Sequence, residues 1–109
     1  MNYIKYQQGD VILQQVSEAE FNASSQIKHR IDTHDTRAVL AEGEATGHYH
    51  AVYMNDMLDN AGITLCKNSE YDRQNRGIVV TGAAVELRHE EHHTLTLEPG
   101  FYLQRIVKE

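Results

Sequence analysis

The sequence is short of the residues that mark several protein classes. It has one cysteine, one proline and no tryptophan among 109 residues. A single cysteine excludes an internal disulfide, and a chain of this length can bury a core without one. We therefore expect the protein in a reducing compartment, the cytoplasm.

Long apolar runs and positive charge are also scarce. No stretch reaches the roughly 18 apolar residues of a membrane span, and the N-terminal residues hold no apolar run of signal-peptide length. Sixteen acidic against ten basic residues give a net charge of −6, which repels a phosphate backbone. We expect no membrane insertion, no secretion and no nucleic-acid partner.

The composition, with 40% apolar and 24% charged residues, is typical of a globular protein. The length is that of a single domain spanning residues 1–109. Apolar and polar residues alternate with period two in short stretches separated by Gly, Asn and Asp, which predicts β-strands. The stretches are residues 3–6, 11–13, 27–31, 37–41, 48–54, 63–66 and 101–107, with 78–87 as the longest apolar-rich segment.

Between these stretches lie turns and loops. Ser17 precedes two glutamates and could cap one short helical turn within residues 17–25, which we treat as a connection. Residues 42–47 and 68–77 read as loops. About eight short strands with tight turns fit a closed barrel or a two-sheet roll better than an open sheet. We predict an all-β fold, a small β-barrel or two-sheet β-roll.

Histidine is abundant, and five of the seven histidines fall into two clusters: His48, His50, His89, His92 and His93. His48 and His50 are two apart on a predicted strand, so both imidazoles project from one side of the sheet, about 7 Å apart at the backbone. Two ring nitrogens can then converge on one ion. His29 and His34 have no such partner and are expected to be ordinary strand or surface residues.

The second cluster, residues 88–93, lies between apolar segments that should pair as a hairpin. A three-residue loop, residues 90–92, keeps Leu87 opposite Leu95 and makes His89 and His93 a cross-strand pair. A two-residue loop would pair His89 with His92 but place Leu87 opposite Thr94, breaking the apolar register. The odd–even parity of the inward-facing residues therefore favours His93 as the partner of His89.

Neutral imidazoles together with a carboxylate suit a divalent metal ion such as Zn, Fe, Ni or Mn. The ligand candidates are His48, His50, His89 and His92, with Glu91 or His93 as alternates, and Glu90 or Glu91 could serve as a general base. A charged surface turn with solvated histidines is the competing interpretation. If carboxylates crowd the rings at the hairpin tip, they should raise the histidine pKa values in the metal-free protein.

Four motifs occur in order along the chain: Gly9-Asp10-Val11, Leu40-Ala41-Glu42-Gly43-Glu44-x-Thr46-Gly47-His48-x-His50, His89-Glu90-Glu91-His92 and Leu97-x-Pro99-Gly100-x-Tyr102. This pattern resembles a group of small uncharacterised bacterial and phage proteins, a resemblance that implies no activity. In that group the second cluster ends at the position of His92, which favours His92 over His93.

Gly43 precedes His48-x-His50 by five positions, which resembles the first metal-binding motif of cupins. The resemblance implies a cupin-like β-barrel, with His89 or His92 as a third ligand and Asp56 as the nearest acid after the motif. Two functions remain open. One is a small metal-dependent enzyme acting on a small molecule. The other is a binding or accessory module, phage- or prophage-associated, with structural histidines. In both cases we expect a symmetric homodimer.

Overall fold

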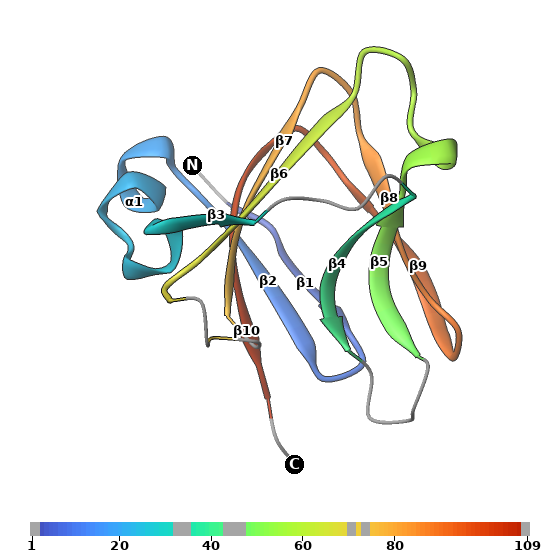
Figure 1. The fold of residues 1–109 in the computed structure, drawn as a ribbon, viewed down its shortest axis with the longest axis horizontal. Coiled ribbons are helices and arrows are strands. Elements are labelled where there is room, and N and C mark those ends of the chain that lie inside the picture. Colours follow the sequence, from blue (N-terminus) through green and yellow to red (C-terminus); the bar gives the residue numbers. More distant parts are fainter. Residues whose placement is uncertain (1–2, 32–35, 43–47, 70–71, 73–74, 108–109) are drawn as a thin grey trace.

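Short antiparallel strands form two sheets in the described part of the chain. The structure is a computed structural model that describes residues 3–31, 36–42, 48–69, 72 and 75–107. The larger sheet runs in the order β1 (Lys5–Gln8), β2 (Val11–Val16), β10 (Gly100–Ile106), β7 (Arg76–Thr81), β6 (Gly62–Lys67) and β3 (His29–Ile31). The smaller one runs β4 (Arg37–Glu42), β5 (Tyr49–Tyr53), β8 (Val85–His89) and β9 (His92–Leu97) (Figure 1). The predicted all-β class is confirmed.

The core lies between these sheets and draws on both. Strand β8 shows why: its odd-numbered Val85 and Leu87 are buried while Glu86 and Arg88 are exposed, as period-two alternation requires. The larger sheet contributes Val11, Leu13, Leu65, Ile78, Val80 and Tyr102, and the smaller one Ala38, Leu40, Ala41, Val52, Val85, Leu87 and Leu97. Each sheet therefore buries one face against the other.

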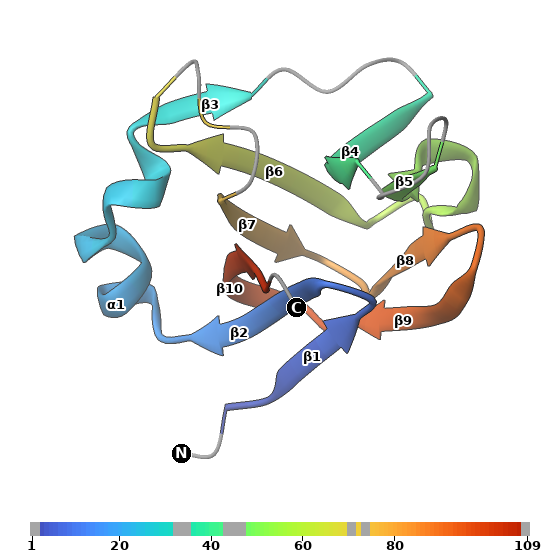
Figure 2. The ribbon, with the colours of Figure 1, turned by 90° about the horizontal axis from the view of Figure 1, so that it is seen from below.

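The predicted capped turn is a short helix, α1 (Glu18–Ala23). The hydroxyl of Ser17 accepts a hydrogen bond from the Glu20 amide, which satisfies one of the free donors at the helix start. Phe21 is buried, and its ring lies 5.2 Å from that of Phe101 on β10. This contact anchors a helix too short to be stable alone. Figure 2 shows α1 at the end of the molecule opposite β8 and β9.

The apolar segment 78–87 belongs to both sheets. It breaks at Gly82, whose φ of +77° lies in the left-handed region, so that β7 ends in one sheet and β8 begins in the other. A Cβ at Gly82 would lie only 1.8 Å from the carbonyl oxygen of Asn60. The turn at Gly82 therefore packs directly against the backbone at Asn60.

Within the described residues the strand order does not close into a ring. Strands β1 and β3 are the ends of the larger sheet, and β4 and β9 are the ends of the smaller one. Two short 3-10 turns, η1 (Ser25–Ile27) and η2 (Met54–Asp56), complete the described elements. None of the described helices has the length and apolar character needed to cross a bilayer. His34 and the glycines of residues 43–47 lie outside the described residues.

Candidate metal centre

The β8–β9 hairpin pairs its histidines differently from the parity prediction. His89 lies opposite His92, across the two-residue tip Glu90-Glu91. Leu87 nevertheless stays opposite Leu95, because the register shifts between Leu87 and His89. A β-bulge places one extra residue on one strand, so the hairpin keeps both the apolar register and the short turn. The predicted pair of His89 with His93 is wrong for this reason.

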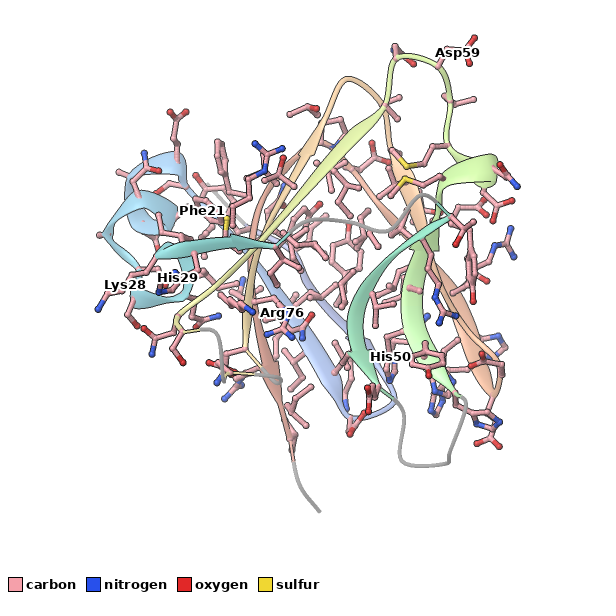
Figure 3. The ribbon with its side chains drawn as sticks, in the orientation of Figure 1. Phe21, Lys28, His29, His50, Asp59 and Arg76 are labelled. Atoms are coloured by element: carbon pink, nitrogen blue, oxygen red, sulfur yellow. The ribbon has the colours of Figure 1, made fainter. Side chains whose placement is uncertain are left out.

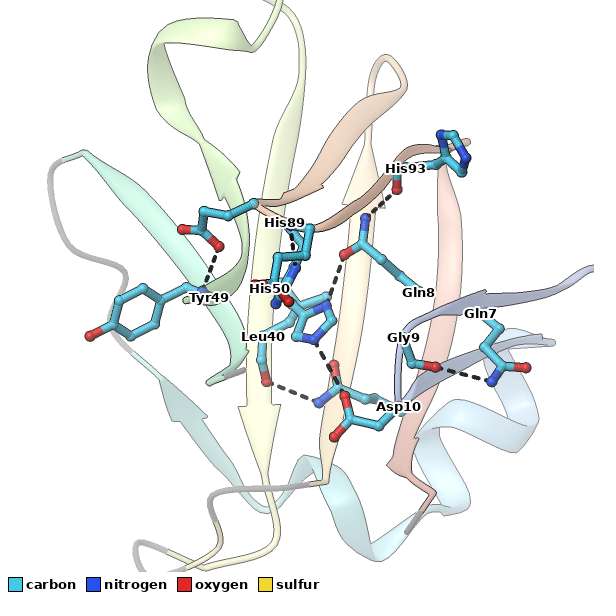
Figure 4. A network of polar contacts seen from close by, with 12 residues as sticks. Gln7, Gln8, Gly9, Asp10, Leu40, Tyr49, His50, His89 and His93 are labelled. Carbon is cyan, nitrogen blue, oxygen red and sulfur yellow. Dashed lines mark hydrogen bonds and ion pairs between the residues drawn. The ribbon is translucent and has the colours of Figure 1, made fainter. Parts of the chain in front are cut away.

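His93 is consequently turned away from the other histidines. It is exposed, and Figure 4 shows its ring pointing away from His50 and His89. Its backbone takes part in the local contacts, because the carbonyl oxygen of His93 accepts a hydrogen bond of 2.8 Å from Nε2 of Gln8.

The other four imidazoles of the two clusters gather where β5 meets the hairpin. Strand β5 pairs with β8, so the two strands that carry the histidine clusters lie side by side. The ring centroids of His50 and His89 are 4.2 Å apart, and those of His89 and His92 are 4.6 Å apart. His48 meets His89 edge-on at 5.8 Å. The rings form a compact stack that runs from buried His50 to exposed His92.

Gln8, at the end of β1, fixes the protonation pattern of His50. Its side-chain Nε2 donates to the carbonyl oxygens of Leu87, at 2.9 Å, and His93, at 2.8 Å. The amide orientation is thereby set, so Oε1 of Gln8 accepts and Nδ1 of His50, 2.9 Å away, must donate. The lone pair of a neutral His50 therefore lies on Nε2. Gln8 and His50 are both buried.

The β1–β2 turn supplies two further contacts. Oδ1 of Asp10 lies 3.4 Å from Nε2 of His50. Gly9 has a φ of +59°, and a Cβ at this position would lie 2.5 Å from Nε2 of His92. Glycine is thus required here both by the backbone conformation and by the imidazole that lies against it.

Burial and neighbouring imidazoles favour the uncharged form of His50 and His89. Burial, followed by the nearby imidazole of His89, lowers the pKa of His50 to about 4, against an opposing effect of Asp10. Burial, followed by His92, also lowers the pKa of His89, although Glu90 and Glu91 act in the other direction. The expectation of raised histidine pKa values at the hairpin tip is therefore wrong for His89. Desolvation and neighbouring imidazoles outweigh the exposed carboxylates.

The two tip glutamates make different contacts. Oε2 of Glu90 accepts a hydrogen bond of 3.1 Å from the backbone amide of Tyr49, which ties the tip to β5. Hydrogen bonds from its own amide and from that of Tyr49 lower the pKa of Glu90. The Glu91 amide donates to Nδ1 of His89 at 3.1 Å, and Oε1 of Glu91 lies 3.5 Å from Nδ1 of His48.

The arrangement brings together three potential metal ligands. One ligand atom each from His48, His89 and Glu90 lies within 4.8 Å of the other two. Nδ1 of His48 is buried and has no hydrogen-bond partner among the described residues. Two imidazoles and a carboxylate form a donor set that suits a first-row divalent ion.

Other residues singled out in the sequence lie elsewhere. Asp56 is engaged by Arg88 at 2.8 Å, in an exposed ion pair. His29 is exposed on β3, and Cys66 is partly buried on β6, where burial raises the pKa of its thiol. A nucleophilic cysteine needs a thiolate, whereas a cysteine whose thiol pKa is raised by burial stays protonated and packs as a small apolar side chain.

Sequence reasoning missed Gln8 and Asp10 as partners of His50. They flank Gly9 in the connection between two predicted strands, residues 3–6 and 11–13. The motif Gly9-Asp10-Val11 was visible, but nothing in the local sequence connects it with a histidine 42 residues after Gln8.

Comparison with known proteins identifies a family without assigning an activity. Searches among curated proteins and among solved structures found no match. Residues 7–107, nearly the whole chain, match the family described as "Domain of unknown function (DUF8820)". The chain therefore belongs to the DUF8820 family.

Proposed function

We infer that this domain binds a divalent metal ion at the junction of β5 with the β8–β9 hairpin. The observation that carries the proposal is the convergence of ligand atoms from His48, His89 and Glu90 within 4.8 Å. Nδ1 of His48 supports it, because this buried nitrogen makes no hydrogen bond within the described residues and a metal ion would satisfy a nitrogen that otherwise loses its hydration. The Glu91 carboxylate, 3.5 Å from this nitrogen, would lie beside the ion.

The remaining candidates surround this set. His50 and His92 stack against His89 and limit its movement, while Glu91 lies beside His48 as an alternate carboxylate. The imidazole and carboxylate donors suit Zn, Fe, Ni or Mn. The His48-x-His50 pair and a third histidine from a neighbouring strand also support a relationship to cupins.

Metal binding must change one hydrogen bond. Nδ1 of His89 accepts from the Glu91 amide, so a neutral His89 carries its proton on Nε2. An ion can bind at Nδ1 only by displacing the Glu91 amide, or at Nε2 only by moving the proton to Nδ1. Either route breaks this bond, which is exposed and therefore contributes little stability. We expect the Glu91 amide resonance to move on metal binding.

The test uses tag-free full-length protein, freed of metal with EDTA and reconstituted separately with Zn²⁺, Ni²⁺, Fe²⁺ and Mn²⁺. Metal content and thermal melts are measured for the wild type, His48→Ala and His89→Ala. His29→Ala and His93→Ala are matched controls, because both remove an exposed imidazole away from the ligand set.

We expect the wild type and both controls to bind metal and gain stability. A ligand at 100 times its Kd stabilises the native state by about 2.7 kcal/mol. His48→Ala and His89→Ala should lose this gain while their metal-free forms remain folded, because the core rests on residues such as Val52 and Leu87. A wild type that binds none of the four ions, or single variants that melt with metal exactly as the wild type does, would overturn the proposal.

A structural role for the histidines is the second candidate, and the ring stacking favours it. His50 and His89 pack 4.2 Å apart and His89 and His92 4.6 Å apart, so they form a small core between β5 and the hairpin. Under this alternative the domain is a binding or accessory module, and His89→Ala would destabilise the metal-free protein. The metal-free melts described above distinguish the two functions.

A further inference from the structure

Four polar side chains form a row across one end of the larger sheet. Neighbouring strands place them in the order Gln104 on β10, Arg76 on β7, Lys67 on β6 and His29 on β3. Lys67 lies opposite Arg76 because the preceding pair along these two antiparallel strands is Cys66 with Gly77. Directly opposite residues share a face, so the four side chains lie on the same side of the sheet.

This side of the larger sheet faces the smaller sheet. Gln104 is buried there, at 1% exposed, and its Nε2 donates to the carbonyl oxygen of Leu40 on β4 at 2.9 Å. Exposure rises along the row, since Arg76 and Lys67 are partly buried and His29 is exposed. Figure 3 shows His29 beside α1 and Arg76 nearer the middle of the molecule. The row therefore runs from the core out to solvent.

The guanidinium of Arg76 is held in place but has no counter-charge in contact with it. Its Nη1 donates to the backbone carbonyl oxygens of Asp72, at 2.8 Å, and Asn75, at 3.0 Å. Nε is buried and makes no hydrogen bond within the described residues, and no ion pair joins Arg76 to a described carboxylate. Burial lowers the pKa of Arg76, and the charge of Asp72 acts in the opposite direction. A partly buried cation with an unsatisfied N–H is costly.

The orientation of this guanidinium leaves one edge for a ligand. Because Nη1 is engaged by the backbone, the remaining edge consists of Nε and Nη2, and Nη2 also makes no hydrogen bond to a described residue. Two N–H groups on one edge of a guanidinium match two oxygens of a carboxylate or a phosphate. Lys67 adds positive charge on the neighbouring strand, where opposite Cβ atoms are about 5 Å apart. An anion bound at Arg76 would therefore be attracted by Lys67 as well.

We propose that Arg76 and Lys67 form a binding site for an oxyanion group, a phosphate or a carboxylate. Nε and Nη2 of Arg76 donate to two of its oxygens, and Lys67 contributes charge. The backbone below the site is fixed, because Nε2 of Gln26 donates to the carbonyl oxygens of Arg76, at 2.9 Å, and Gln104, at 3.0 Å. The site lies on the larger sheet and does not depend on metal binding at the smaller one.

The experiment titrates inorganic phosphate, and separately acetate, into ¹⁵N-labelled full-length protein. The protein is first stripped of metal with EDTA, and the EDTA is then removed, so that no bound ion and no chelator competes for the anion. Sodium chloride at matched ionic strength separates binding from screening. The readout is the Nε–H resonance of Arg76 together with the backbone amide resonances near it.

Two variants accompany the wild type. Arg76→Lys keeps the positive charge but loses the edge with two donors. Arg105→Lys is the matched control, because Arg105 is exposed and, as the neighbour of Gln104 in β10, projects from the opposite face of the sheet.

We expect at least one of the two anions to move the Arg76 Nε–H resonance in a saturable way that sodium chloride does not reproduce. The anion that binds more tightly identifies the class of ligand. Arg76→Lys should weaken its affinity at least about tenfold, through the loss of a charge-assisted hydrogen bond. Arg105→Lys should leave the affinity unchanged. Shifts that sodium chloride reproduces, or equal affinities in the wild type and Arg76→Lys, overturn the site.

A second variant keeps the proposal testable if Arg76→Lys fails to fold. Lys67→Gln removes the neighbouring charge and leaves Arg76 in place, so it should weaken anion binding, and an unchanged affinity overturns the role of Lys67. An Arg76 Nε–H resonance that neither anion moves in the wild type overturns the whole site. Because every sample lacks metal, that result leaves the proposed metal-binding function standing.

Discussion

Acidification should destabilise the metal-free protein through His50. In the folded state burial lowers the pKa of His50 from 6.5 to about 4. The unfolded chain therefore takes up a proton below pH 6.5 that the native state does not accept until about pH 4. The stability linked to this group is fully present above pH 6.5 and is lost as the pH falls towards 4. Burial lowers the pKa of His89 too, which adds an effect of the same sign.

The size of the effect follows from the pKa difference. One pH unit corresponds to about 1.4 kcal/mol, so the interval between 6.5 and about 4 corresponds to a loss of about 3 kcal/mol from His50. The native stability of a small domain is about 5–15 kcal/mol. A loss of this size should be clear in a denaturant titration.

The assay is urea unfolding with EDTA present, at intervals from pH 7.5 to pH 4. His50→Gln removes the titrating ring, and its amide can still donate to Oε1 of Gln8. His93→Gln is the matched control, since His93 is exposed. We expect the wild type and the control to share a steep fall in stability between pH 6.5 and pH 4, and His50→Gln to show a shallower one.

Two results would refute this reasoning. One is a wild-type stability that rises as the pH falls through this range. The other is a folded His50→Gln whose pH dependence matches that of the wild type. If His50→Gln does not fold, the NMR titration of His50 in the wild type decides directly, because its midpoint should lie well below 6.5.

Two substitutions test the turn that holds the histidines. Gln8→Leu should cost roughly 2–4 kcal/mol in urea unfolding, because it removes the donor to two carbonyls and the acceptor of buried His50. Gln7→Leu, which alters an exposed neighbour, should cost less than about 0.5 kcal/mol, and equal losses would contradict the argument. Gly9→Ala should cost about 1–2 kcal/mol through its positive φ and shift the ring resonances of His92; an unchanged His92 spectrum would show that the ring does not lie against Gly9.

Much of the fold follows from local patterns. The alternation in residues 85–89 gives a half-buried strand, and Ser17 caps a helix as its position before Glu20 predicts. The division into two sheets does not follow, because it depends on which strands pair. The segment 78–87 looks continuous in sequence, yet a left-handed Gly82 sends its two halves into different sheets.

The candidate site is predictable only in part, for a similar reason. Clustering and spacing were sufficient to single out His48, His50 and His89, and they do meet. The parity argument gives the wrong partner for His89, because a β-bulge in the hairpin adds a residue that the hydrophobic pattern does not reveal. Asp10 is brought to the histidines only by tertiary packing of the β1–β2 turn.

The same bulge links the fold to the chemistry of the site. Without it, the apolar pairing of Leu87 with Leu95 would place His93, rather than His92, opposite His89. With it, the ring of His92 lies against Gly9, and the backbone carbonyl of His93 becomes an acceptor for Gln8. That contact in turn orients the Gln8 amide and fixes the tautomer of His50. The hairpin tip thus determines which nitrogen of the deepest histidine donates to Gln8 and which one faces Asp10.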